Sequence, residues 1–392
     1  MDAFVELLQK YQYFGWIAFI VAVFLTPVAI RAAHRFGVLD IPDQKLKPHA
    51  RPIPYLGGTA ICVAWSAALI VAMAGGTCDW HALLPLLVGG IAMSLLGLID
   101  DVRGLSPKLR LAIGTVIVTA VILSTKTGFR LVDSVLIGAD VLLGDGTARP
   151  PQFISVPLSV ILSIVIVLGA CNSTNLIDGL DGLCSGVTGL ISLGFFILAS
   201  HLALWRYSET GDPVRLVLAI SMFGAAVGFL PWNFNPAKIF MGDAGSVLLG
   251  YNCGILILLF AEGGRLRWIL AALMIFALPV FDTALAMFRR WRAGRSIFEG
   301  DRSHFYDQLV QRGLSVRQTV LLCYSLTLVY AAIGLLMLWI RPGPEAPVPV
   351  IRTRYAVPLY VSVCGLTALL AWRAGLTKPE EARSAGGQAD GD

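Results

Sequence analysis

The sequence predicts an all-α membrane protein, a polytopic helical bundle with about eleven transmembrane helices. Of its 392 residues, 56% are hydrophobic and only 14% are charged, and the mean hydropathy is +0.75. Soluble domains carry about 25% charged residues. Charge-poor stretches of roughly 17–22 residues recur, each long enough to cross a hydrocarbon core of about 30 Å as a helix. The alternating apolar pattern of a barrel strand is absent, which favours helices.

The predicted spans follow one another along most of the chain. They cover residues 14–33, 54–74, 82–99, 108–126, 154–171, 183–204, 215–232, 246–262, 267–288, 319–340 and 356–373. The segment 127–153, which Gly and Pro punctuate, is expected to form a small hairpin outside the membrane. We therefore interpret residues 1–373 as one integral membrane domain and residues 374–392 as a disordered cytoplasmic tail.

Basic residues predict the orientation. Arg31, His34 and Arg35 follow the first span, and with eleven spans nineteen of the thirty Lys and Arg fall on that side. Because positive residues favour the cytoplasm, we expect the N-terminus outside, the C-terminus inside and a plasma membrane location. The first span lacks a basic leader and is too long for a cleaved signal. We expect no nucleic-acid partner, because no basic-aromatic array is present.

Polar residues gather in five loops, all on the predicted cytoplasmic side. These are DQKLKPHARPIPYLGG, with Lys47; GLIDDVRGLSPK, with Asp100, Asp101 and Lys108; CNSTNLIDGLDGL, with Asn172, Asn175, Asp178 and Asp181; PWNFNPAKIFMGDAGS, with Asn233, Phe240 and Asp243; and EGDRSHFYDQL, with Arg302 and His304. One Asp or Asn beside a helix is usually a cap or a solvated charge. Five such loops on one face indicate an active site there, since charge near hydrocarbon is costly.

The residue types in these loops suit diphosphate chemistry. Carboxylate and amide oxygens without His or Cys clusters favour Mg²⁺, with Mn²⁺ as the alternative. Asp243 lies in a glycine-flanked turn directly before a predicted helix, whose first amides and dipole favour an anion. Lys47, Lys108, Arg302 and His304 supply positive charge for phosphates. The spacing of three from Asn172 to Asp181 lines one wall of a cavity, on one face if the turn is 3₁₀-like and drifting around the axis if it is α-helical.

Together these motifs resemble one family. The DD followed by LSPK, the NxxNxxDGxDGL, the NPAKIFMGDAGS and the late histidine loop occur in the order found in the polyprenyl-phosphate N-acetylhexosamine-1-phosphate transferases of glycosyltransferase family 4. Eleven spans resemble the GlcNAc branch, which uses undecaprenyl phosphate. The resemblance implies that a lipid phosphate attacks the β-phosphorus of a UDP-amino sugar, giving a lipid-diphospho-sugar and UMP with Mg²⁺ assistance.

The resemblance also implies a role for each motif residue. Asp100, Asp101, Asp243 and His304 would be catalytic, with Asp243 and Asp101 at the metal. Phe240 would stack on uracil, and Asp181 and Asn233 would contact the nucleotide. The remaining substrate-binding residues would be Lys47, Lys108, Asn172, Asn175, Asp178 and Arg302. Asp100 can be written as a general base, but a phosphate monoester is mostly dianionic at pH 7, so we favour a positioning role.

Several alternatives stay open. HFYD places Tyr306 and Asp307 where the family often has further histidines, which weighs against the phospho-MurNAc-pentapeptide branch and leaves the sugar undecided. A transporter of an anionic metabolite would place charges near the midplane of the bilayer, often within inverted repeats. A catalytically silent protein of the same fold is a third interpretation. Asp282, inside a predicted span, either faces the cavity or is neutral and hydrogen-bonded in the bundle. The oligomeric state is undecided, with a homodimer among the alternatives.

Overall fold

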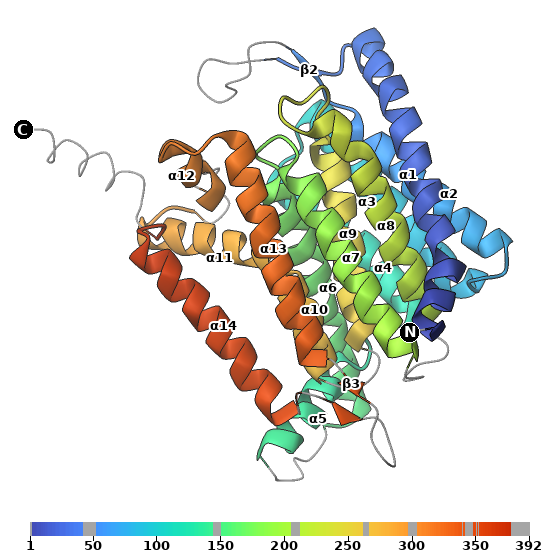
Figure 1. The fold of residues 1–392 in the computed structure, drawn as a ribbon, viewed down its shortest axis with the longest axis vertical. Coiled ribbons are helices and arrows are strands. Elements are labelled where there is room, and N and C mark those ends of the chain that lie inside the picture. The colour runs from blue at the N-terminus through green and yellow to red at the C-terminus, as the bar shows by residue number, and fades with distance from the viewer. Residues whose placement is uncertain are drawn as a thin grey trace, which may run out of the picture.

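The computed structural model describes residues 2–41, 52–143, 150–204, 212–261, 266–296, 304–338, 340–341, 348–349, 351 and 353–377. In this part of the chain fourteen helices dominate, and two short antiparallel strand pairs join them (Figure 1). The elements are α1 (Asp2–Phe36), β1 (Leu39–Asp40), β2 (Ile53–Pro54), α2 (Gly57–Ala74), α3 (Trp80–Arg103), α4 (Pro107–Thr125), α5 (Leu131–Leu143), α6 (Gln152–Ile177), α7 (Leu183–Leu204), α8 (Asp212–Asn233), α9 (Gly242–Ala261), α10 (Leu266–Ile275), α11 (Ala277–Arg292), α12 (Phe305–Gln311), α13 (Val316–Leu338), β3 (Ile340–Arg341), β4 (Val348–Pro349) and α14 (Thr353–Arg373).

The membrane bundle predicted from the sequence is confirmed. Among the described residues, ten helices are long and apolar enough to cross a membrane: α1, α2, α3, α4, α6, α7, α8, α9, α13 and α14. They coincide with ten of the eleven predicted spans. The eleventh, 267–288, is divided between α10 and α11.

Instead of one straight helix, α10 and α11 meet at Phe276 with a bend of 75°. Pro279 explains the break, because proline lacks an N–H group and its ring clashes with the carbonyl four residues earlier, at Ile275. In Figure 1, α11 runs across the direction of the other long helices. Its last turn carries Arg289, Arg290 and Arg292, charges that are costly in hydrocarbon.

The central helix of the bundle is α9, in which every residue except Asp243 is buried. It packs against α3 on one side and α6 on another. Glycines permit this close approach: a Cβ on Gly250 would lie 2.5 Å from Cys171 Cα, and one on Gly254 2.8 Å from Val167 Cα. Helices in membranes associate through such small residues, because lipid offers no hydrophobic drive between them.

Two peripheral predictions differ from the structure. The segment expected to form a hairpin contains helix α5, and Ser134 of this helix donates a hydrogen bond to the Ala261 carbonyl at the end of α9 (2.9 Å). The hairpin prediction is therefore wrong for the described residues. The predicted tail begins with an ordered turn at 374–377, where the Leu376 carbonyl accepts hydrogen bonds from Arg289 and Gln308 (3.3 Å each). Residues 378–392 lie outside the described residues.

The polar loops converge on one end of the bundle. β2 and α12 lie at the upper end in Figure 1, whereas α5 and β3 lie at the lower end. At the upper end the Phe240 N–H group donates to the Pro54 carbonyl (2.9 Å), which joins the α8–α9 loop to β2. The convergence predicted from the sequence is thus present in the described loops.

We expect Gly97→Ala to destabilise the protein by about 1–3 kcal/mol, the usual cost of overpacking. A Cβ on Gly97 would lie 2.5 Å from the Asp243 carbonyl carbon and 2.6 Å from the Ala244 nitrogen, both backbone atoms that cannot move aside. Gly365→Ala is the matched control, since nothing lies within 4 Å of its Cβ. Thermal unfolding in detergent compares the two, and equal stability of both variants would contradict the packing at Gly97.

Candidate active site

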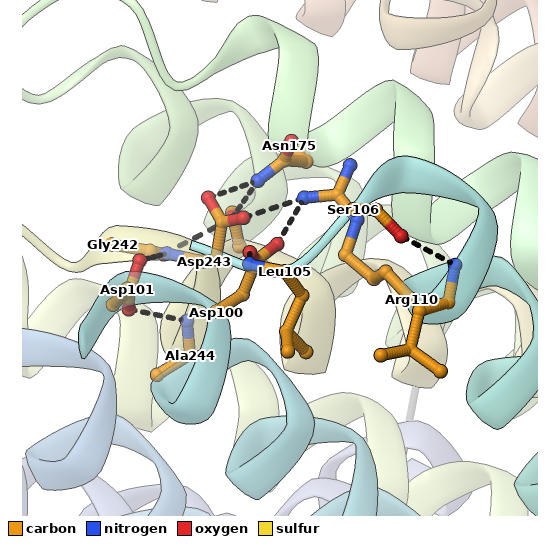
Figure 2. Close-up of polar contacts among 11 residues, drawn as sticks. Asp100, Asp101, Leu105, Ser106, Arg110, Asn175, Gly242, Asp243 and Ala244 are labelled. Carbon is orange, nitrogen blue, oxygen red and sulfur yellow. Dashed lines mark hydrogen bonds and ion pairs between the residues drawn. The ribbon is translucent and has the colours of Figure 1, made fainter. Parts of the chain in front are cut away.

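A carboxylate from another helix holds the N-terminus of α9. Gly242 begins α9 with φ of +66°, which favours glycine, and a Cβ there would lie 2.5 Å from Asp101 Oδ2. Asp101, at the end of α3, accepts hydrogen bonds from the backbone N–H groups of Asp243 (2.8 Å) and Ala244 (3.1 Å), as Figure 2 shows. Asp101 therefore caps the N-terminus of α9 although it belongs to another helix. The helix dipole favours negative charge at that terminus.

The Asp243 side chain is held from both sides. Its Oδ1 accepts a hydrogen bond from Asn175 Nδ2 on α6 (2.6 Å), and its Oδ2 pairs with Arg110 Nη1 on α4 (2.6 Å). The same Arg110 nitrogen pairs with Asp100 Oδ2 (2.8 Å), while Asp100 Oδ1 accepts from the Leu105 N–H group (2.7 Å). Figure 2 shows one guanidinium nitrogen of Arg110 in contact with both carboxylates. One cation thus links two aspartates that lie far apart in the sequence.

Arg110 was missed by the sequence analysis, which chose Lys108. α4 begins at Pro107, and Ser106 caps it by accepting from the Leu109 N–H group (3.3 Å). At 100° per residue, two positions separate side chains by about 200° around a helix, so Lys108 is exposed while Arg110 turns inward. A signal was available, because an arginine inside a predicted span is costly unless it serves a site.

The Asn and Asp series divides between a helix and a turn. α6 is α-helical to Ile177, so the four side chains drift around the axis rather than share one face. Asn172 is exposed, Asn175 reaches Asp243, and Asp178 ends the helix. Asp181 Oδ2 accepts from Asn235 Nδ2 (2.9 Å) and from the Ala237 N–H group (3.0 Å), which ties the turn to the α8–α9 loop.

Asn233 has a similar tethering role in the structure. It is 2% exposed; its Oδ1 accepts from the Gly182 N–H group (3.2 Å) and from Ser185 Oγ (2.9 Å), and its Nδ2 donates to the Ile239 carbonyl (3.0 Å). Asp181 and Asn233 therefore shape the loops around the site. Their predicted contact with a nucleotide stays a prediction.

Negative charge is concentrated at this end of the bundle. Burial raises the pKa of Asp178 well above its usual value, and the carboxylates of Asp243, Asp101 and Asp181 raise it further. Burial likewise raises the pKa of Tyr55, and Asp101 is the foremost of the nearby carboxylates that add to the effect. Burial and the neighbouring carboxylates therefore favour the neutral forms of Asp178 and Tyr55.

Phe240 is fixed by its backbone and its ring. Its N–H group donates to the Pro54 carbonyl, and its own carbonyl accepts from the Gly57 N–H group (2.9 Å each). The ring packs edge-to-face against Tyr55, with centroids 6.3 Å apart and planes at 90°. A partly buried ring thus stands three residues before Asp243, at the same end of the bundle.

His304 lies at the start of α12. It is 4% exposed, and its Nδ1 lies 2.7 Å from Asp282 Oδ2. Asp282 is therefore hydrogen-bonded inside the protein rather than facing open space, which bears out the position, though not the neutral charge state, of the second sequence-based alternative. Lys47 and Arg302 lie outside the described residues.

A cavity of about 670 Å³, lined in part by Arg110, lies beside the cluster of Arg110, Asp100 and Asp243. Helices α3, α4, α6, α9 and α11 line it with Met93, Leu96, Gly97, Pro107, Arg110, Leu111, Gly114, Thr115, Ile164, Val165, Leu168, Gly169, Cys171, Asn172, Asn175, Leu176, Val247, Met287 and Arg290. Most of these side chains are apolar. The two charged ones, Arg110 and Arg290, stand near the ends of α4 and α11. We call this cavity the groove.

Comparisons with known proteins bear on this site. A family model described as glycosyl transferase family 4 matches residues 83–261, which include Asp100, Asp101, Asn175 and Asp243. The chain is 31% identical to the probable undecaprenyl-phosphate N-acetylglucosaminyl 1-phosphate transferase of Bacillus subtilis, over 80% of this chain and 82% of that protein. The chain belongs to glycosyl transferase family 4. The resemblance seen in the motifs is therefore confirmed.

Two further relatives are similar to the chain over most of their length. The chain is 30% identical to the decaprenyl-phosphate N-acetylglucosaminephosphotransferase of Mycolicibacterium smegmatis, over 87% of this chain and 85% of that protein. It is 28% identical to the undecaprenyl-phosphate alpha-N-acetylglucosaminyl 1-phosphate transferase of Escherichia coli K12, over 81% of each. The similarity thus extends well beyond the residues that the family model matches.

Within the described residues, no three His, Cys, Asp or Glu side chains are arranged to hold a metal ion. Mg²⁺ usually takes only one or two carboxylates and completes its shell with water and substrate phosphates, so the partly exposed Asp243 fits such a site. Both oxygens of Asp101 already cap α9. The metal roles of Asp243 and Asp101 stay predictions.

We expect Arg110→Ala to destabilise this family member by about 1–3 kcal/mol, because two partly buried carboxylates would lose their shared cation. Lys108→Ala is the control and should change stability by less than about 0.5 kcal/mol, as exposed positions usually do. Both are measured by unfolding in detergent. In an Asp100→Asn background the loss from Arg110→Ala should shrink. Equal losses in the two backgrounds would show that Arg110 does not act through Asp100.

Proposed function

We propose that this protein transfers N-acetylglucosamine 1-phosphate from UDP-GlcNAc to a polyprenyl phosphate, releasing UMP. Its family and the activities for which its relatives are named support this reaction. The observation in this chain that supports the reaction is that an apolar environment meets a charged one. The apolar groove reaches Arg110, and Arg110 holds the carboxylates of Asp100 and Asp243.

The groove suits the lipid substrate. A polyprenyl chain is a long hydrocarbon, and burying it against side chains such as Leu96 and Leu168 is favourable. Its phosphate needs cationic hydrogen-bond donors, which Arg110 and Arg290 provide in the same groove. We therefore assign the isoprenoid chain to the groove and the phosphate to the end near these two arginines.

The reaction exchanges one phosphoanhydride bond for another. An oxygen of the lipid phosphate forms a bond to the β-phosphorus of UDP-GlcNAc, the bond from that phosphorus to the bridging oxygen breaks, and UMP leaves with the electron pair. The lipid phosphate is already mostly dianionic near pH 7, so no base has to remove a proton. Asp100 then acts by orienting Arg110, since phosphoryl transfer depends on positioning and charge stabilisation. A covalent aspartyl intermediate is the alternative.

A divalent cation belongs to this proposal. We assign Mg²⁺, or Mn²⁺ in its place, to Asp243 together with the diphosphate oxygens of the substrate. When bound, the metal would neutralise charge on the diphosphate. The protein's own residues hold Asp243 in place: Asn175 donates to one of its oxygens and Arg110 to the other.

The proposal also includes an orientation. Lys and Arg are more numerous in the loops at the active-site end, which favours a cytoplasmic site in the plasma membrane. A transporter would share one feature with this structure, the broken span α10–α11. The break, however, brings Asp282 into contact with His304 beside the other polar loops. The broken span therefore does not favour transport.

We expect Asp243→Asn to abolish UMP release from polyprenyl phosphate and UDP-GlcNAc, because the amide replaces a metal-binding oxygen. Purified wild type should release UMP with UDP-GlcNAc and Mg²⁺, and a panel of other UDP-sugars tests the sugar. Asp79→Asn is the control, since it removes the same charge at the opposite end of α3. Substantial Mg²⁺-dependent turnover in Asp243→Asn would refute the metal assignment, and an inactive wild type would refute the function.

Phe240→Ala should weaken UDP-GlcNAc binding by about 5–150-fold, the equivalent of 1–3 kcal/mol of base–aromatic stacking. Affinity for polyprenyl phosphate should barely change. Phe240→Tyr keeps the ring and should bind like wild type. Substrate titrations give the two affinities separately, and an equal loss for both substrates would point to collapse of the loop instead of loss of stacking.

A further inference from the structure

Asp282 is a buried carboxylate whose two oxygens have separate partners. It is 1% exposed, in the middle of α11. Its Oδ2 lies 2.7 Å from His304 Nδ1, and its Oδ1 accepts a hydrogen bond from the Phe305 N–H group (3.1 Å). A buried carboxylate is costly unless it is paired, and here both oxygens bind the junction between the preceding loop and α12.

This geometry favours a proton on Nδ1 of the imidazole. An ionised carboxylate accepts hydrogen bonds and cannot donate them, so an ionised Asp282 requires hydrogen on the ring nitrogen that it contacts. A histidine with Nδ1 protonated keeps Nε2 as its free lone pair in the neutral ring. Carboxylates that orient a histidine through the opposite nitrogen in this way are common partners of functional imidazoles.

Tyr306 holds the ring from its face. The two rings are stacked, with centroids 5.4 Å apart and planes at 7°. Tyr306 is 2% exposed, and its hydroxyl donates to the Leu176 carbonyl in the last turn of α6 (2.7 Å). Burial and the carboxylates of Asp282, Asp307 and Asp178 raise the pKa of Tyr306 well above its usual value, so the phenol remains a donor.

The Tyr306 ring has little room to move. A Cβ on Gly179 would lie 2.7 Å from Tyr306 Cε2 and 2.8 Å from its Cζ. The stacked pair is therefore wedged against the turn that follows Asn175 and carries Asp178. His304 is thereby fixed to α11 through its edge and to α6 through Tyr306.

We propose that Asp282 and Tyr306 are positioning residues for His304: Asp282 keeps the proton on Nδ1, Tyr306 fixes the plane of the ring, and Nε2 is the nitrogen left to accept a hydrogen bond from a hydroxyl or amide N–H group of the UDP-sugar. The role of Nε2 rests on the proposed function. The arrangement of proton and ring does not, because it is a property of the protein without substrate.

Asp282→Asn has a defined consequence. The amide has only one oxygen, and the buried Phe305 N–H group needs an acceptor. If that oxygen stays with Phe305, the amide NH₂ group faces His304 Nδ1 and donates to it. The imidazole must then move its proton to Nε2, so we expect the tautomer to invert.

Nitrogen-15 NMR of the full-length protein labelled at histidine tests this directly. The His304 signals are those lost in His304→Gln. We expect a protonated Nδ1 and an unprotonated Nε2 in wild type, and the reverse in Asp282→Asn. Asp307→Asn, which removes a carboxylate from the same short helix, should keep the wild-type pattern. Protonation on Nε2 in the wild-type neutral ring would overturn the proposal, whether or not Asp282→Asn folds.

Kinetics provides the second arm. With UDP-GlcNAc and polyprenyl phosphate, Asp282→Asn should lower kcat by about 10- to 100-fold, as loss of such an orienting partner usually does, with KM for UDP-GlcNAc changed less than kcat. Tyr306→Phe retains the stacked ring and should lose less activity than Tyr306→Leu. An unchanged kcat in Asp282→Asn with an inverted tautomer would overturn the role of Nε2, and inactive wild type would instead refute the proposed reaction.

Discussion

The hydrogen bonds from the first amides of α9 to Asp101 determine where the other groups of the site can stand. Asp101 is at the end of α3 and Asp243 is in the first turn of α9, so the cap joins two motifs separated by more than a hundred residues. α9 is buried along its length and has glycine-mediated contacts with its neighbours. These contacts fix the axis of α9. The cap then determines how far along that axis Asp243 lies at the end of the bundle.

Charge is the second constraint. Asp100 and Asp243 share one guanidinium, and the amide of Asn175 satisfies the remaining Asp243 oxygen. Arg110 suits this bridge because guanidinium is planar and always charged, whereas a lysine would be a point charge. Under the proposed function, two more negatively charged groups must enter, a lipid phosphate and a diphosphate. One arginine cannot neutralise all of them, which is the electrostatic argument for a divalent cation at Asp243.

Much of this organisation was predictable from the sequence, and the exceptions have physical reasons. Ten spans and the carboxylates at one end follow from hydropathy and from the cost of charge near hydrocarbon. Arg110 was missed because the choice between it and Lys108 depends on the start of α4, and a shift of two residues reverses which side chain faces inward. Asn233 illustrates another limit: a motif places it near the site, but only the fold shows that its amide joins two loops.

Hydropathy could not predict the bend in this span for a related reason. Residues 267–288 are apolar enough to cross the membrane, and other helices, such as α3 and α6, continue through internal prolines. At Pro279 the chain turns instead, and the turn has two consequences that a straight helix could not combine. α11 contributes Arg290 to the groove, and it contributes Asp282 to His304. A helix that had simply crossed the bilayer would carry these side chains along the bundle axis. The 75° bend instead connects the groove assigned to the lipid with the histidine assigned to the UDP-sugar, so the break in α10–α11 is part of the site's architecture.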